Sequence, residues 1–180
     1  LVLTLLMSFL IVNCSDLVNE VQLNQDANTL ITEVDQRPQL IVPRDLNIDP
    51  ERYLLERVYK SIKYPAIARA QDVSGSYIAN FTVRKDGTID DLKVYSFEDA
   101  PKDLNVTPED NGRRMVIVGY GNTNITKGDS STIDTEKADR AIRNEISRVI
   151  NDLPDWEAAK VKGEAVATKM NLLFTYRLEK

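Results

Sequence analysis

Hydrophobic and polar residues alternate over residues 76–84, so that this segment has one apolar and one polar face. Such alternation predicts a β-strand. Asp86 and Gly87 follow it, and glycine supplies the positive φ that a tight turn requires. A return strand is expected over residues 88–97, with a bulge near Asp90-Asp91, where the apolar pattern changes face. The segment therefore predicts a β-hairpin.

Two other segments carry apolar residues at helical spacing. The first begins at Asp49 and Pro50, which suit the N-cap and the first position of a helix. Pro65 ends or restarts this helix, and a short helical turn is expected after it. A long helix should begin at Asp134 or Thr135 and end at Pro154. The apolar stripe of the first helix, which we expect to face a core, is Leu54, Leu55, Val58, Tyr59 and Ile62.

The last regular segment, residues 165–178, alternates again and predicts a strand in which Leu173 is the one apolar residue on the polar side. The order helix, helix, strand, strand, helix, strand predicts an α+β fold. We expect a small antiparallel three-stranded sheet with two helices packed on one face and water on the other. Residues 98–132 form an inserted loop or hairpin in this plan, with an added strand over 115–120 that either caps the sheet or binds a ligand.

The start of the chain predicts export and a lipid anchor. Residues 1–12 are almost wholly apolar but fall short of the roughly 20 residues that a membrane-spanning helix needs. The run fits the apolar part of a signal peptide, and it is followed by Cys14, the only cysteine. Residues 1–14 resemble a bacterial lipoprotein signal, although Asn13 departs from the small residue usual there. The alternatives are a truncated membrane anchor or an ordinary signal with a chance cysteine. Residues 15–49 are expected to be a linker, and residues 50–180 the domain.

Composition narrows the classes of function. The formal net charge is -5, which argues against nucleic-acid binding because that requires a basic face. Histidine is absent, which excludes a histidine-dependent triad or zinc centre. Adjacent carboxylates occur at 90–91, 98–99 and 109–110, but neighbours on a strand point to opposite faces, so solvated charge is the simpler interpretation. We expect no enzyme activity, no cofactor and no metal.

Several short motifs occur in a fixed order on these predicted elements. They are Tyr64-Pro65, Ala68, Gly75, Phe81, Val83, Asp86-Gly87, Asp134, Trp156, Gly163 and Val166. In order and spacing they resemble the C-terminal domain of TonB, the periplasmic energy transducer of Gram-negative outer-membrane transport. Most of them also fit plain structural roles, with Phe81, Val83 and Trp156 in the core and Gly87 in a turn.

The resemblance implies recognition by strand addition. In the family, the final strand lies at an open sheet edge and pairs with the TonB box, an extended segment of an outer-membrane transporter. Leu173 would then be an exposed apolar contact. The other interpretation is a merely tolerated edge, guarded by Lys169 and Arg177. The residues that the resemblance implies for partner binding are Tyr64, Met170, Asn171, Leu172, Leu173, Phe174, Thr175 and Tyr176.

Two hypotheses follow, because the chain lacks the spanning helix with its histidine and the proline-rich spacer of TonB itself. One is a periplasmic TonB-like protein-binding domain, membrane-anchored through lipid on Cys14, which binds a TonB-box-like segment of an outer-membrane transporter or another envelope protein. The other is an assembly lipoprotein that uses the same fold to self-associate, as in a homodimer, through edge strands. A carboxylate enzyme built on the insertion is a third and weaker alternative.

Overall fold

The computed structural model describes residues 35–104, 114–120 and 134–179. The predicted α+β class is confirmed. The helices are α1 (Pro50–Ser61), α2 (Ala66–Ala70) and α3 (Thr135–Asn151), with a 3-10 turn, η1, at Lys102–Leu104. The strands are β1 (Gln39–Leu40), β2 (Gly75–Val83), β3 (Ile89–Ser96), β4 (Arg114–Tyr120), β5 (Trp156–Glu157), β6 (Ala159–Val161), β7 (Glu164–Val166) and β8 (Thr168–Glu179).

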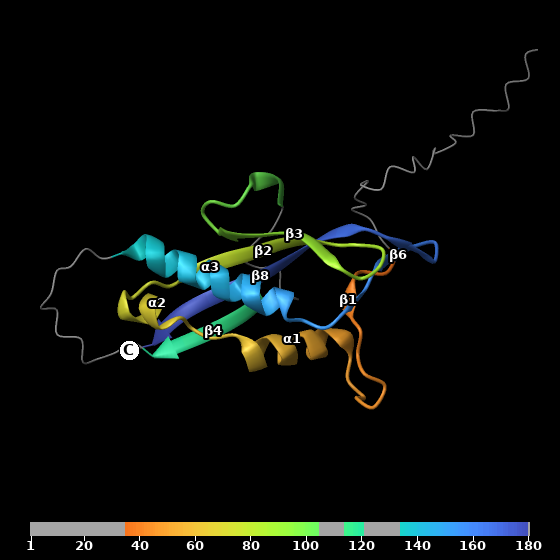
Figure 1. Ribbon diagram of the computed structural model, residues 1–180, viewed down its shortest axis with the longest axis horizontal. Coiled ribbons are helices and arrows are strands. Elements are labelled where there is room, and N and C mark those ends of the chain that lie inside the picture. The colour runs from red at the N-terminus through yellow and green to blue at the C-terminus, as the bar shows by residue number, and fades with distance from the viewer. Residues whose placement is uncertain (1–34, 105–113, 121–133, 180) are drawn as a thin grey trace, which may run out of the picture.

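The main sheet has four strands in the order β3-β2-β8-β4 (Figure 1). β2 is antiparallel to both β3 and β8, whereas β4 runs parallel to β8. The prediction of a three-stranded antiparallel sheet was therefore wrong. The reason lies in the insertion, because Met115 and Ile117 give β4 a buried apolar face that extends the core beyond β8. The added strand over 115–120 is confirmed as β4, which lies at the edge of the sheet beside β8.

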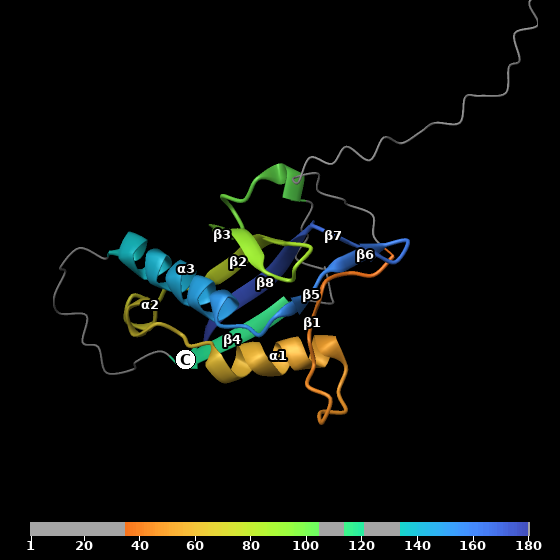
Figure 2. The same ribbon diagram turned by 45° about the vertical axis from the view of Figure 1, so that its right-hand side comes forward.

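The helices cover one face of this sheet, where α3 crosses the strands and α1 runs alongside β4 (Figures 1 and 2). Asp49 caps α1 by accepting from Glu51 and Arg52 backbone N–H groups, both at 3.0 Å. Asp134 caps α3 in the same way, through the Lys137 N–H at 2.9 Å. Both predicted caps are thus confirmed. The side chains that the helices and strands bury together include Leu54, Val58, Phe81, Val83, Ile142, Ile146, Val149, Leu172 and Phe174.

The second face of the sheet is less open than the alternating pattern predicts. Ile78 of β2 and Leu173 of β8 are directly paired, and they are only 1% and 4% exposed. Beside them, the Asn171 side chain donates a hydrogen bond to the Leu104 carbonyl at 3.3 Å. The η1 turn therefore lies close to this face, and water does not cover all of it.

The β2–β3 hairpin is confirmed, including its turn and its bulge. Gly87 has φ +84°, the conformation for which glycine is favoured. The register passes from Asn80 opposite Lys93 to Thr82 opposite Asp90, which leaves one extra residue in β3. Asp91, inside that interval, has φ 53°. An extra residue in a positive-φ conformation is how a bulge is accommodated in an antiparallel pair.

Residues 35–49, which were expected to be linker, belong to the folded unit. β1 pairs with β5 so that Leu40 lies opposite Trp156, and Leu40 is only 1% exposed. Gln36 forms a further bridge to Lys160. The physical reason is that Leu40 fills the core beside Trp156. The strand that carries it has only two residues, which is too short to show a periodic pattern in the sequence. The predicted signal, Cys14 and residues 15–34 lie outside the described residues.

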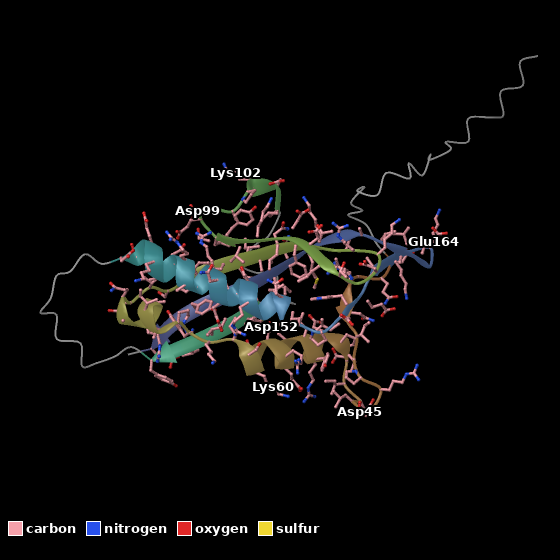
Figure 3. All side chains as sticks on the ribbon, viewed as in Figure 1. Asp45, Lys60, Asp99, Lys102, Asp152 and Glu164 are labelled. Carbon is pink, nitrogen blue, oxygen red and sulfur yellow. The ribbon has the colours of Figure 1, made fainter. Side chains whose placement is uncertain are left out.

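The predicted final strand, 165–178, divides into two parts. β7 folds back on β6 as a small hairpin, whose turn residues Lys162 and Gly163 have φ 51° and 83°. Two consecutive positive φ values fit a two-residue hairpin turn. Glu164 marks the outer end of this hairpin, at the far side of the molecule from α2 (Figure 3). Only β8 enters the main sheet. Within the described ranges, none of the helices has the length and apolar character required to cross a membrane.

Candidate partner-binding site

The strand expected to receive a partner, β8, is a central strand. It pairs with β2 over its residues 168–176 and with β4 over its residues 173–179. The prediction that this strand lies at an open edge was therefore wrong for residues 173–179, because β4 pairs with them. The stretch from Met170 to Leu172 precedes the part of β8 that β4 pairs. The binding role itself stays a prediction.

The side chains predicted to contact a partner are mostly inside the domain. Met170, Leu172, Phe174 and Tyr176 belong to the core on the helix-covered face. On the opposite face, Leu173 is buried, so the expected exposed apolar contact is wrong; it packs at the position paired with Ile78. This burial removes these side chains from the surface that a partner strand could contact.

The two remaining residues on that face, Asn171 and Thr175, are half-buried and already hydrogen-bonded. Asn171 accepts from the Asn80 side-chain amide at 2.7 Å. Thr175 lies 3.0 Å from the Ser76 hydroxyl and accepts from the Arg114 Nε at 3.3 Å. Both side chains therefore serve cross-strand pairing within the sheet.

Tyr64, the other predicted contact, is part of an aromatic cluster with Tyr176. The two rings meet edge to face with centroids 5.0 Å apart, a favoured aromatic geometry. The Tyr64 hydroxyl donates to the Val73 carbonyl at 2.6 Å. Burial, with a smaller contribution from the Asp72 carboxylate, raises the pKa of Tyr64 to about 12. The structure thus brings Tyr64 together with β8, but as packing.

β4 is firmly seated on this cluster. A Cβ placed on Gly119 would come 2.5 Å from the Tyr64 ring, so only glycine permits the observed approach. Met115 and Ile117 are 1% and 6% exposed. Burial of two such side chains contributes about 3 to 6 kcal/mol. β4 is therefore an integral strand of the sheet.

The strand that does lie at this edge is β4, and one of its backbone groups is bonded to α1. The Val116 N–H donates to the Tyr59 hydroxyl at 3.0 Å. Because backbone groups of successive residues alternate between the two sides of a strand, those of Val118 also face away from β8. We call the backbone of residues 116–120 on this side, with Tyr59, the outer edge of β4. Tyr59, Val118 and Tyr120 are 48%, 39% and 71% exposed.

Sequence reasoning missed this edge. Tyr59 was assigned to the core stripe of α1, but its side chain reaches the strand instead. Residues 115–120 were recognised as a strand without a position in the sheet. One signal was present, because Val118 and Tyr120 are large apolar residues at alternate positions that are not needed to fill the core.

Two clefts offer other candidate sites, and the arginine of the second is already paired with carboxylates. A cleft of about 430 Å³ lies between the β1 segment and the start of α1, next to Trp156. A second, of about 330 Å³, is lined by Tyr77 and Arg143. Arg143 is already bonded to Asp139 at 2.6 Å and to Asp99 at 3.3 Å. Among the described residues, no group of three potential metal ligands is present.

One carboxylate of each described adjacent pair has a structural partner. Asp90 forms an ion pair with Arg84, and this hydrogen bond holds the pKa of Asp90 below its ordinary value. The pKa of Asp99 is likewise lowered, first by the Ser96 hydroxyl and then by Arg143. A lowered pKa keeps these groups ionised, which suits charge pairing rather than proton donation. The pair at 109–110 lies outside the described residues.

Fold and site together define an α+β domain whose mixed sheet carries an exposed edge strand. Residues 60–102 match the family described as Gram-negative bacterial TonB protein C-terminal, which confirms the predicted family over that segment. The match spans the end of α1, then α2, β2 and β3, and stops at the first residue of η1. The family is a non-enzymatic transport-coupling domain, and the match indicates a periplasmic location in the Gram-negative envelope. No curated protein matches the chain.

Proposed function

We propose that residues 35–179 form a TonB-like protein-binding domain that binds an extended segment of an outer-membrane transporter, or of another envelope protein, by strand addition. The family match implies a TonB-like role in energy transduction for envelope transport. The observation that carries the finer proposal is the exposed edge strand of the sheet, beside which α1 lies. In such complexes, backbone hydrogen bonds supply affinity and alternate side chains supply selectivity.

The test is calorimetric titration of the full chain with synthetic peptides from the N-terminal segments of outer-membrane transporters. The expected result is saturable binding at one peptide per chain. Peptides of the same composition in scrambled order are the matched control, and they should bind more weakly because their alternation is lost. If no transporter segment gives saturable binding, transporter recognition is contradicted.

A lipid on Cys14 would tether this domain to a membrane. The proposal rests on the apolar run that ends beside the only cysteine. Metabolic labelling with a fatty acid should mark the parent protein and leave the Cys14→Ser variant unlabelled. Equal labelling of the two proteins would contradict lipidation at this residue.

Self-association is the second candidate function. It is favoured by Val118 and Tyr120, which are exposed on a strand at the sheet edge, where a second copy could pair. Analytical ultracentrifugation distinguishes the candidates: a concentration-dependent dimer without peptide binding supports assembly, and a monomer that binds peptide supports recognition.

A further inference from the structure

A partner strand has two ways to join this side of the sheet. It can replace β4 beside β8, or it can pair with the outer edge of β4 and extend the sheet by one strand. We propose the second: the partner pairs with the outer edge of β4, and its backbone replaces the Tyr59 hydroxyl on the Val116 N–H. This inference rests on the proposed function, since it assigns the surface that performs it.

Three contacts hold β4 in place against a competitor. Met115 and Ile117 are buried in the core, and Gly119 fits against the Tyr64 ring with no room for a Cβ. All seven residues of β4 are in register with β8. A peptide that displaced β4 would have to reproduce the buried side chains as well as the backbone ladder. A partner that pairs with the outer edge of β4 leaves both the buried side chains and the β4–β8 ladder in place.

The outer edge of β4 already binds one hydrogen-bonding group. The Tyr59 hydroxyl oxygen, 3.0 Å from the Val116 nitrogen, occupies the place that a partner carbonyl would take. The next N–H on this side belongs to Val118, about 6.6 Å farther along the strand. Among the described residues, no hydrogen bond to the Val118 backbone from outside the β4–β8 ladder is formed. The N–H groups of Val116 and Val118 therefore have the spacing of alternate carbonyl groups in an extended partner chain.

The side chains beside this edge indicate the chemistry of the partner. Val116, Val118 and Tyr120 point to the same face of β4, so apolar residues at alternate positions of the partner would lie on them. Arg177 is paired in register with Val118. Its side chain is 62% exposed and meets Glu179 only at 3.7 Å. The partner segment is therefore extended, apolar at alternate residues, and favoured by a carboxylate that can reach Arg177.

Two substitutions at Val118 distinguish the contribution of its backbone N–H to binding from that of its side chain. Proline at this position removes an N–H that faces away from β8, a placement that edge strands tolerate. In the titration with transporter segments, Val118→Pro should weaken binding by about tenfold or more, because one donor is lost and the proline ring obstructs pairing. Val118→Ala, which keeps the N–H, should weaken it less. Equal effects of the two substitutions would overturn the proposed backbone pairing.

A disulfide that locks β4 to β8 distinguishes the two edges. Val116 and Thr175 are directly opposite in the register, and cysteines at both positions, in a Cys14→Ser background, can be oxidised or reduced. Peptide affinity that is the same in the oxidised and the reduced form of this variant supports the outer edge of β4, because the substitution at Val116 is present in both forms. Affinity that is lost on oxidation and restored by reduction overturns the inference and leaves the proposed function standing. Binding in neither form, nor in the parent chain, overturns both.

Tyr59→Phe tests whether the Tyr59 hydroxyl competes with the partner for the Val116 N–H. The variant keeps the ring and leaves the Val116 N–H without its partner, so peptide affinity should rise several-fold in the locked, oxidised protein. The lock matters because it excludes easier departure of β4 as the cause. An unchanged or weaker affinity in the locked protein would overturn the replacement of Tyr59 by the partner. A dimer that Val118→Pro dissolves, with no effect on peptide binding, would assign the edge to a second copy and overturn the proposed occupant.

Discussion

The backbone of Gly87 lies against the backbone of Trp156. The Trp156 N–H donates to the Gly87 carbonyl at 3.4 Å, and a Cβ on Gly87 would come 2.1 Å from the Trp156 carbonyl oxygen. The turn of the β2–β3 hairpin therefore rests directly on β5. Two motifs that lie far apart in the sequence, the Asp-Gly turn and the tryptophan, are parts of one contact.

Gly87→Ala should destabilise the protein by more than the cost of its backbone conformation alone. Positive φ costs a non-glycine residue about 1–2 kcal/mol, and the clash with a backbone atom that cannot rotate away adds to this. Gly163→Ala is the matched control, because Gly163 has nearly the same φ, +83°, but no atom within 4 Å of a new Cβ. Urea unfolding should show the larger loss for Gly87→Ala. Equal losses would mean that the contact with Trp156 has no energetic role.

Gly119→Ala should loosen β4 by forcing the Tyr64 ring out of its place, since the new Cβ would lie 2.5 Å from that ring. We expect a loss of about 1–3 kcal/mol in the free energy of unfolding. Tyr64→Ala removes the clash, so the two substitutions should be non-additive when combined. A double mutant whose loss equals the sum of the single losses would contradict direct contact.

Leu40→Ala should cost about 2–5 kcal/mol, because it empties a core position that is 1% exposed. Its neighbour provides the control: Ile41 is 53% exposed, and Ile41→Ala should change stability by no more than about 0.5 kcal/mol. Both variants are measured by chemical unfolding of the full chain. If the two variants lost similar amounts of stability, residues 35–49 would be a linker rather than part of the folded unit.

Alkaline pH should destabilise the fold through Tyr64. Its pKa is raised from 10.0 to about 12, so the folded state holds the proton more tightly than the unfolded state. The resulting stabilisation is complete below pH 10 and is lost as the pH rises toward 12. Burial also raises the pKa of Tyr77 and Tyr176, which adds to the same trend.

Unfolding experiments at a series of pH values, with tyrosinate absorbance recorded in parallel, measure this trend. Tyr64→Phe should be less stable at neutral pH, because it loses the hydrogen bond to Val73, and should lose less stability on going to high pH. An unchanged slope in this variant would contradict the assignment to Tyr64.

Local signals predicted the elements that depend on neighbours in the sequence. The Asp-Gly turn, the bulge at Asp90-Asp91 and the caps Asp49 and Asp134 are each specified within a few residues, and each is present. The family was predicted from motifs between Tyr64 and Val166, and those on α2 and the hairpin lie within residues 60–102, which carry the match. Such features can be predicted without knowing which strands pair in the sheet.

The candidate site could not be predicted in the same way, because it depends on pairing between distant segments. Nothing near Met115 indicates that its strand runs parallel to β8. The alternating pattern of residues 165–178 predicts that Leu173 is an exposed contact, yet Ile78 interrupts the pattern of β2 in the same way, and the two residues are paired. Two apolar exceptions on strands that pair were a signal that the second face is covered. Leu40 gave no signal, since a two-residue strand has no period.

The position of β8 has a consequence for how the sheet is assembled. This strand comes after both of its neighbours, β2 and β4, in the chain, yet it lies between them. Until it enters, the hairpin and β4 have no common partner, and two unpaired backbone edges face each other across a gap. Insertion of one strand completes both ladders at once, so we expect the sheet to form late and cooperatively in folding. A chain interrupted before residue 168 would keep both edges open, and open edges are where aggregation begins.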